Sequence, residues 1–244
     1  MKEPEFKKIF LLLIIISVII LLACSKSENS GTDNGSTTLE TKPQYNNTSA
    51  GVYKGIIIGS TGIIVFTINN GNNIVKGYLT IDNQKDTLST TTAIVSGQPL
   101  INVVFTGRFS SMILNANADG SNANLTNIQI TGHTNPTIFI MHENSTKQIY
   151  CYEGTFSGSK AGTLNCARIG INDGDTAYVL TRITGDTTLS NGFGQVINNS
   201  TTMNLYRFLT VTFVVQGSFS GNNFNGTWNW AGIGNGTFAC TRTY

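Results

Sequence analysis

The side chains in this sequence that could do acid–base chemistry are few and do not form a recognisable catalytic motif. The two histidines, His133 and His142, lack the surrounding motif that would give a nucleophile, a base and an orienting carboxylate. Asp173, Glu143 and Glu153 are the candidates for a hydrolase of envelope polysaccharide. Glycoside hydrolysis needs two carboxylates that face one cleft about 5–10 Å apart. Asp173 lies in the turn sequence NDGDT, where Asp is favoured because its side chain hydrogen-bonds the backbone of the turn. We therefore predict no catalytic residue.

Three cysteines, Cys151, Cys166 and Cys240, lie in the second half of the chain. Export to an oxidising compartment would allow a disulfide, but an odd number leaves at least one thiol free. Cys151 and Cys166 flank an expected hairpin centred on Ser159 and could pair, and three buried thiols are an equally good interpretation. No histidine stands near them at ligand spacing, so we expect neither a metal nor a cofactor.

Three aromatic residues near the C-terminus share one face of an expected strand. Phe224, Trp228 and Trp230 alternate with Asn225 and Thr227, which is the period of a β-strand with one buried face. Facing inward, the aromatic side chains would be core or the wall of a ligand cavity. Facing outward, they would form a flat platform for sugars. The polar opposite face favours burial.

Composition and patterning predict an all-β, antiparallel meander. Only 11% of the residues are charged, with 26 Gly and 4 Pro, and Thr, Ile, Val, Tyr and Phe favour strands. The run LYRFLTVTFVV (205–215) alternates apolar and polar residues as a strand does. Asn70-Gly71, Asp119-Gly120, Asp173-Gly174 and Asn235-Gly236 are dipeptides of tight hairpin turns. A barrel-like architecture is our first prediction, and a two-layer β-sandwich is the alternative.

The chain contains an internal duplication. The sequence around Tyr53-Lys54-Gly55 matches that around Tyr152-Glu153-Gly154, and DTLS at 86–89 answers DTTLS at 186–190. A third match joins VVFTGRFS (103–110) to FVVQGSFS (213–220), so the offset grows and indicates an insertion within 191–208. We predict two β repeats, 51–146 and 147–244, which could also form one continuous domain.

The N-terminus has the form of a secretory signal. Lys2, Lys7 and Lys8 precede an uncharged apolar run at 9–22 that is short for a permanent span of about 20 residues. The run ends in Leu21-Leu22-Ala23-Cys24, which resembles the lipobox of bacterial lipoproteins. The resemblance implies that residues 1–23 are removed and that Cys24 is acylated, becoming the lipid anchor. An uncleaved anchor helix is the alternative.

Residues 24–50 are polar and predict a disordered tether between the lipid and the β repeats. Position 25 is Ser and not Asp, which indicates that the lipoprotein is located in the outer membrane. Whether it faces the periplasm or the cell surface is left open. Towards the C-terminus, Gly226-Thr227-Trp228 and Arg242 are the residue types of calycin-type barrels, and the glycine-rich segment is similar to barrels of bacterial surface lipoproteins. These two resemblances imply a barrel and carry no binding site.

The net charge of +2 is spread along the chain and forms no basic stripe, so we expect no nucleic-acid partner. Without a catalytic constellation, the leading hypothesis is an envelope lipoprotein that binds a small ligand, a glycan or a protein partner. A structural or adhesion protein is the alternative, and the polysaccharide hydrolase is the third.

Overall fold

The computed structural model describes residues 39–95, 97–170, 172, 174–207 and 210–244. Within them the chain forms sixteen strands and one 3-10 helix. The first half contributes η1 (Pro43–Tyr45), β1 (Gly51–Ile58), β2 (Gly62–Ile68), β3 (Val75–Ile81), β4 (Gln84–Ser89), β5 (Leu100–Thr106), β6 (Ser110–Ala116), β7 (Asn124–Ile130) and β8 (Thr137–His142). The second half contributes β9 (Ile149–Gly158), β10 (Gly162–Ile169), β11 (Thr176–Ile183), β12 (Leu189–Gln195), β13 (Ser200–Arg207), β14 (Thr210–Ser220), β15 (Asn223–Trp230) and β16 (Gly234–Arg242).

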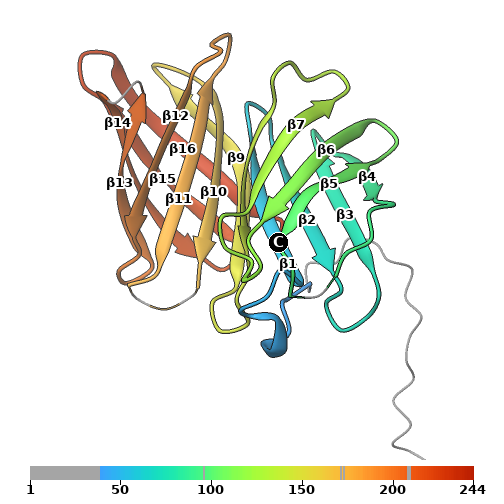
Figure 1. Ribbon diagram of the computed structural model, residues 1–244. Coiled ribbons are helices and arrows are strands. Elements are labelled where there is room, and N and C mark those ends of the chain that lie inside the picture. Colours follow the sequence, from blue (N-terminus) through green and yellow to red (C-terminus); the bar gives the residue numbers. More distant parts are fainter. Residues whose placement is uncertain (1–38, 96, 171, 173, 208–209) are drawn as a thin grey trace, which may run out of the picture. The chain divides into compact units, whose positions relative to one another are not determined.

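Each half forms its own eight-stranded antiparallel sheet (Figure 1). The first sheet has the order β7-β6-β5-β4-β3-β2-β1-β8, and the second closes into a barrel because β16 pairs with β9. The predicted all-β, antiparallel, barrel-like fold made of two repeats is therefore confirmed. In the second sheet, closure removes the unpaired edges that an open sheet exposes.

The strands at the junction of the halves are buried on both faces. β1 and β2 are buried along their whole length, and Tyr53 and Phe66 lie in the core of the first sheet. Val52 and Val65 point the other way and pack in a separate cluster with Cys151 and Ala167 of the barrel. Double burial explains why GVYKGIII and GIIVFTI are nearly continuous apolar runs, whereas β13, with one face in solvent, alternates strictly.

Two expectations about where the chain turns are wrong, because the local residue pattern does not specify the position of a turn. The run LYRFLTVTFVV is a hairpin, β13 and β14, in which Arg207 pairs with Thr210. Asn235-Gly236 lies inside β16, opposite Asn229 and Trp228.

The predicted insertion in the second repeat is also wrong. β2 begins at Gly62 and β10 at Gly162, β5 at Leu100 and β13 at Ser200, so the spacing between equivalent strands does not grow. The third sequence match joins β5, the fifth strand of the first repeat, to β14, the sixth strand of the second. In this chain a short apolar run followed by Gly occurs both at 103–107 and at 213–217, so strands that are not equivalent can still give a match.

Part of the predicted tether is ordered. Residues 1–38, with the proposed signal and Cys24, lie outside the described residues, but residues 39–50 pack on the first sheet, with Thr41 and Ser49 buried. Asn70 receives a hydrogen bond from Lys42 N and donates one to Glu40 O. These partners satisfy the backbone of a segment whose composition alone predicted disorder.

A buried ion pair links this segment to both halves. Glu143, in the connection between β8 and β9, is 0% exposed and accepts a hydrogen bond from Lys54 Nζ of β1 at 2.5 Å. The same carboxylate accepts from Thr41 N at 3.0 Å and from Ile149 N at 2.8 Å. Three donors offset much of the cost of removing a carboxylate from water.

We predict that Lys54→Met lowers the free energy of unfolding by about 3–5 kcal/mol, because it leaves the buried Glu143 charge without its cation. Urea denaturation measures the change, and Lys85→Met, at an exposed position on β4, is the matched control. The double variant Lys54→Met/Glu143→Gln should recover part of the loss, since no unpaired charge remains. Equal stability of Lys54→Met and the control would contradict this role.

Candidate functional site

The most apolar concave surface that we describe is a cleft of about 390 Å³ where β8 meets β11 and β12. Three aromatic side chains follow one another along it: the ring centroids of Phe139 and Tyr178 are 5.0 Å apart, and those of Tyr178 and Phe193 are 6.0 Å apart. Ile58, Ile138, Leu180 and Leu189 complete the walls. We call this surface the aromatic cleft.

Phe193 is the exposed end of the aromatic cleft. Its side chain is 67% exposed, which is unusual for a large apolar ring in contact with other aromatic rings. β12 places it there because Asn191, Phe193 and Gln195 alternate outward from the barrel. Tyr178 lies directly opposite Phe193 in the register of β11 and β12, so the two rings are held side by side by backbone pairing.

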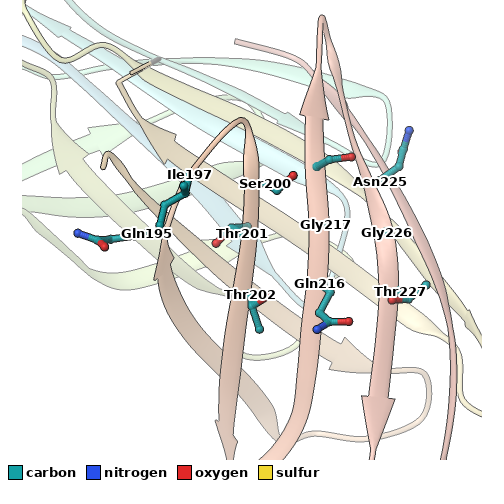
Figure 2. A pocket seen from close by; sticks show the side chains of 11 residues that line it. Gln195, Ile197, Ser200, Thr201, Thr202, Gln216, Gly217, Asn225, Gly226 and Thr227 are labelled. Atoms are coloured by element: carbon teal, nitrogen blue, oxygen red, sulfur yellow. The ribbon is translucent and has the colours of Figure 1, made fainter. Parts of the chain in front are cut away.

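A second concave surface, the polar groove, crosses the outer face of β13, β14 and β15 (Figure 2). Its volume is about 680 Å³. Strand register sets two rows of short polar side chains across it, and in the first row Thr202 pairs with Gln216 and Gln216 with Thr227. The second row consists of Ser200, Ser218 and Asn225.

The polar groove contains hydroxyl and amide groups and, among its lining residues, no charged side chain. Hydroxyls and amides both donate and accept hydrogen bonds. Gly217 and Gly226 lie between the two rows and face each other. A Cβ at Gly217 would lie 2.5 Å from the Phe224 ring, so glycine is needed there for the inner packing of the barrel.

The two surfaces meet on β12. Phe193 lines the aromatic cleft, whereas Gln195 and Ile197, the next outward-facing residues, line the polar groove. Ile197 is 56% exposed and Tyr206, on the neighbouring strand β13, is 43% exposed. The outer face of the barrel therefore carries exposed apolar rings beside an uncharged hydrogen-bonding surface, an arrangement that suits a ligand with both apolar and hydroxylated faces.

The aromatic residues that the sequence singled out lie elsewhere. Phe224 and Trp228 are buried in the core of the barrel, as their alternation with polar residues predicted, and Trp230 packs against that core. Trp228 makes edge contacts with Phe156 and Phe213, and its Nε1 donates to Ser157 O at 3.0 Å. None of these three lines the aromatic cleft or the polar groove, so of the two inward-facing interpretations, core or cavity wall, the structure supports core.

Of the two interpretations of the cysteines, a disulfide between Cys151 and Cys166 is wrong, and three buried thiols is the one that the structure confirms. Both thiols are free and buried, and the strand register places Cys151 opposite Ala167 and Cys166 opposite Tyr152. The hairpin is centred where the sequence indicated, but the cysteines differ in register by one residue. Their side chains therefore lie on opposite faces of the sheet, Cys166 inside the barrel and Cys151 against the first half.

The carboxylates named for hydrolysis do not meet in a cleft among the described residues. Glu143 is enclosed by its three donors. Burial raises the pKa of Glu153, partly offset by a hydrogen bond from Thr243 Oγ1 at 2.9 Å, and Asp173 lies outside the described residues. Burial lowers the pKa of His142, whose Nε2 donates to Ala50 O at 2.8 Å.

Two features are absent from the part of the chain that the structure describes. No cluster there brings together three or more His, Cys, Asp or Glu side chains able to hold a metal ion. No helix there is both long and apolar enough to cross a membrane.

Little in the residue order predicts the aromatic cleft. Tyr178 and Phe193 come from the paired strands β11 and β12 of the second half, whereas Phe139 comes from β8 of the first half. The one local signal is Phe193 between Gly192 and Gly194, an aromatic residue on a strand with no other apolar ring. Only the packing of β8 beside β11 brings the three rings together.

Comparison with protein-family models, with curated protein sequences and with solved structures finds no match to this chain. The geometry of the site is therefore the basis for its interpretation.

We predict that thiol titration of a Cys24→Ala chain in denaturant without reductant counts three thiols, from Cys151, Cys166 and Cys240. In native buffer they should react very slowly, because all three are buried and burial raises the pKa of Cys151 to about 12. A reduced, denatured sample calibrates the total. A single titratable thiol before reduction would show a disulfide and contradict the register argument.

Proposed function

We propose that this chain is a lipid-anchored, non-catalytic protein of the bacterial cell envelope whose barrel binds a neutral glycan on its outer face. The observation that carries the proposal is the continuity of the aromatic cleft and the polar groove along β12. A sugar ring has an apolar C–H face that packs on an aromatic ring, and hydroxyls around its edge that pair with hydroxyl and amide groups. This surface offers both kinds of group side by side.

The absence of charge among the groove residues favours a neutral ligand. An acidic saccharide would require a cation, and Gln216, Asn225 and the hydroxyl residues offer none. A small apolar ligand would need a more enclosed cavity than the open surface around Phe193. Within the proposal, a protein partner is the competing occupant, since exposed apolar patches also serve protein contacts.

The proposed location rests on the N-terminal sequence. The apolar run at 9–22 followed by Leu21-Leu22-Ala23-Cys24 supports export and acylation of Cys24. Acyl chains on Cys24 would hold the chain at the membrane. The polar segment between Cys24 and residue 39 would then act as a spacer between the lipid surface and the barrel.

We expect Phe193→Ala to weaken binding of neutral oligosaccharides by about tenfold, because aromatic contacts of this kind contribute about 0.5–1.5 kcal/mol beyond buried area. Gln216→Ala should weaken it by a smaller factor, since it removes one neutral hydrogen bond of about 0.5–1.5 kcal/mol, whereas Phe193→Ala also removes the apolar area that the ring buries against the sugar. A glycan array identifies ligands, and calorimetry with the best ligand gives the affinities.

Ile233→Ala is the control for this test, because Ile233 is 45% exposed in the turn between β15 and β16 and lines neither surface. Equal binding by wild type, Phe193→Ala and Ile233→Ala would place the glycan elsewhere. Failure of every neutral glycan to bind would favour the structural or adhesion role.

For the anchor, we expect Cys24→Ala to abolish acylation and to leave an unprocessed precursor, because the thiol that receives the lipid is gone. Mass spectrometry of the membrane fraction measures both changes. Cys240→Ala, at a buried position in the barrel, is the control and should be processed and acylated normally. An unchanged mass and membrane attachment of Cys24→Ala would rule out the lipobox interpretation.

A further inference from the structure

The interior of the barrel is apolar along most of its length but cationic at one end. On β10, Leu164 and Cys166 point inward and belong to the barrel core. Arg168 continues the same alternation, so its side chain also points inward, and it is only 5% exposed. An arginine this deeply buried is normally paired with a carboxylate.

Arg168 has no such partner. Its Nη1 and Nη2 both donate to a neutral acceptor, Asn199 Oδ1, at 3.3 Å each, and its guanidinium lies 4.8 Å from the centroid of the Phe219 ring. Its Nε is buried without a hydrogen-bond partner. Among the described residues, no carboxylate lies within ion-pair distance of Arg168. The positive charge is therefore inside the protein and uncompensated.

A second arginine lies at the same end of the barrel. Arg242 follows the inward-pointing Cys240 on β16, and its guanidinium is 4.2 Å from the centroid of the Tyr150 ring. Strand register places Arg242 opposite Tyr152 and Arg168 opposite Tyr150. The two arginines thus flank β9, with two tyrosine rings between them.

The electrostatics of Tyr152 reflect this arrangement. Burial raises the pKa of Tyr152 to about 12, and the charges of Arg168 and Arg242 oppose that rise.

A third polar group at this end, Thr201 Oγ1, is buried without a hydrogen-bond partner, two residues after Asn199 in the chain. Thr201 belongs to β13 and is 5% exposed, so it adds a hydroxyl to the same end of the interior.

Two carboxylates of the junction, Asp175 and Glu143, are engaged by other groups. Asp175 accepts from Asn172 N at 2.7 Å and lies 3.8 Å from Lys147 Nζ. Glu143 is paired with Lys54. Neither neutralises the two arginines, and a pair of cations that share one end of a barrel repel each other unless an anion lies between them.

We propose that Arg168 and Arg242 bind the oxyanion group of a small ligand, a carboxylate or a phosphate, at this end of the barrel. Arg168 Nε, the unpaired donor, and the guanidinium of Arg242 supply charge-assisted hydrogen bonds. Thr201 Oγ1 adds a hydroxyl, and Tyr150 and Tyr152 supply apolar walls. Thr201 also lines the polar groove, whereas Arg168, Arg242, Tyr150 and Tyr152 line neither the polar groove nor the aromatic cleft.

The test uses the purified full chain at low ionic strength and neutral pH, with inorganic phosphate and acetate as separate probes. An anion that binds only the folded state raises the melting temperature in a concentration-dependent way, and calorimetry gives its affinity. We expect at least one of the two anions to bind. Arg168→Gln and Arg242→Gln should each weaken the affinity for that anion by about tenfold or more. Which probe binds more tightly distinguishes a phosphate ligand from a carboxylate ligand.

Arg108→Gln, at an exposed position before β6, is the control and should bind as the wild type does. If Arg168→Gln does not fold, the more exposed Arg242→Gln still tests the site. Equal stabilisation by sodium chloride, or equal binding by Arg242→Gln and Arg108→Gln, would overturn the proposal. Phe193→Ala should retain anion binding, so failure of the glycan surface and failure of this site are distinguishable.

Discussion

The burial of Glu143 is the constraint on which the junction of the two repeats depends. The carboxylate is fully enclosed and receives donors from Lys54 on β1, from Thr41 in the N-terminal segment and from Ile149 at the start of β9. A charge in that position is tolerated only while its donors stay in place. Through these hydrogen bonds, Glu143 holds the segment before β1, β1 itself and the start of β9 in fixed positions relative to one another.

The apolar packing around this ion pair extends the same junction. One face of β1 and β2 completes the core of the first sheet, and the other packs on Cys151, Ala167 and Leu180 of the barrel. Asn165 Nδ2 donates to Ile57 O and Ser60 O across the junction. As a result, Phe139 on β8 lies beside Tyr178 on β11, which forms the aromatic cleft. The proposed glycan surface is thus a consequence of how the repeats pack.

Much of the fold could be predicted from the sequence, since strand periodicity, turn dipeptides and the duplication depend on local residue order. The inward face of Phe224 and Trp228 also followed from alternation alone. The candidate site could not be predicted, because Phe139, Tyr178 and Phe193 are brought together by packing across the two halves. The sequence left open whether Cys151 and Cys166 pair, and the answer depends on one residue of strand register. A shift of one residue moves a side chain to the other face of the sheet, and the register is set by strand pairing throughout the barrel.

The sequence by itself determined the β class, the two repeats and the apolar faces of the strands, because these are properties of residues that are neighbours along the chain. Only the tertiary structure decided that the second repeat closes as β16 pairs with β9, and that Arg168 is buried without a carboxylate. Both are long-range outcomes. Their energies depend on contacts between residues that are distant in the chain, and the local residue pattern does not specify those contacts.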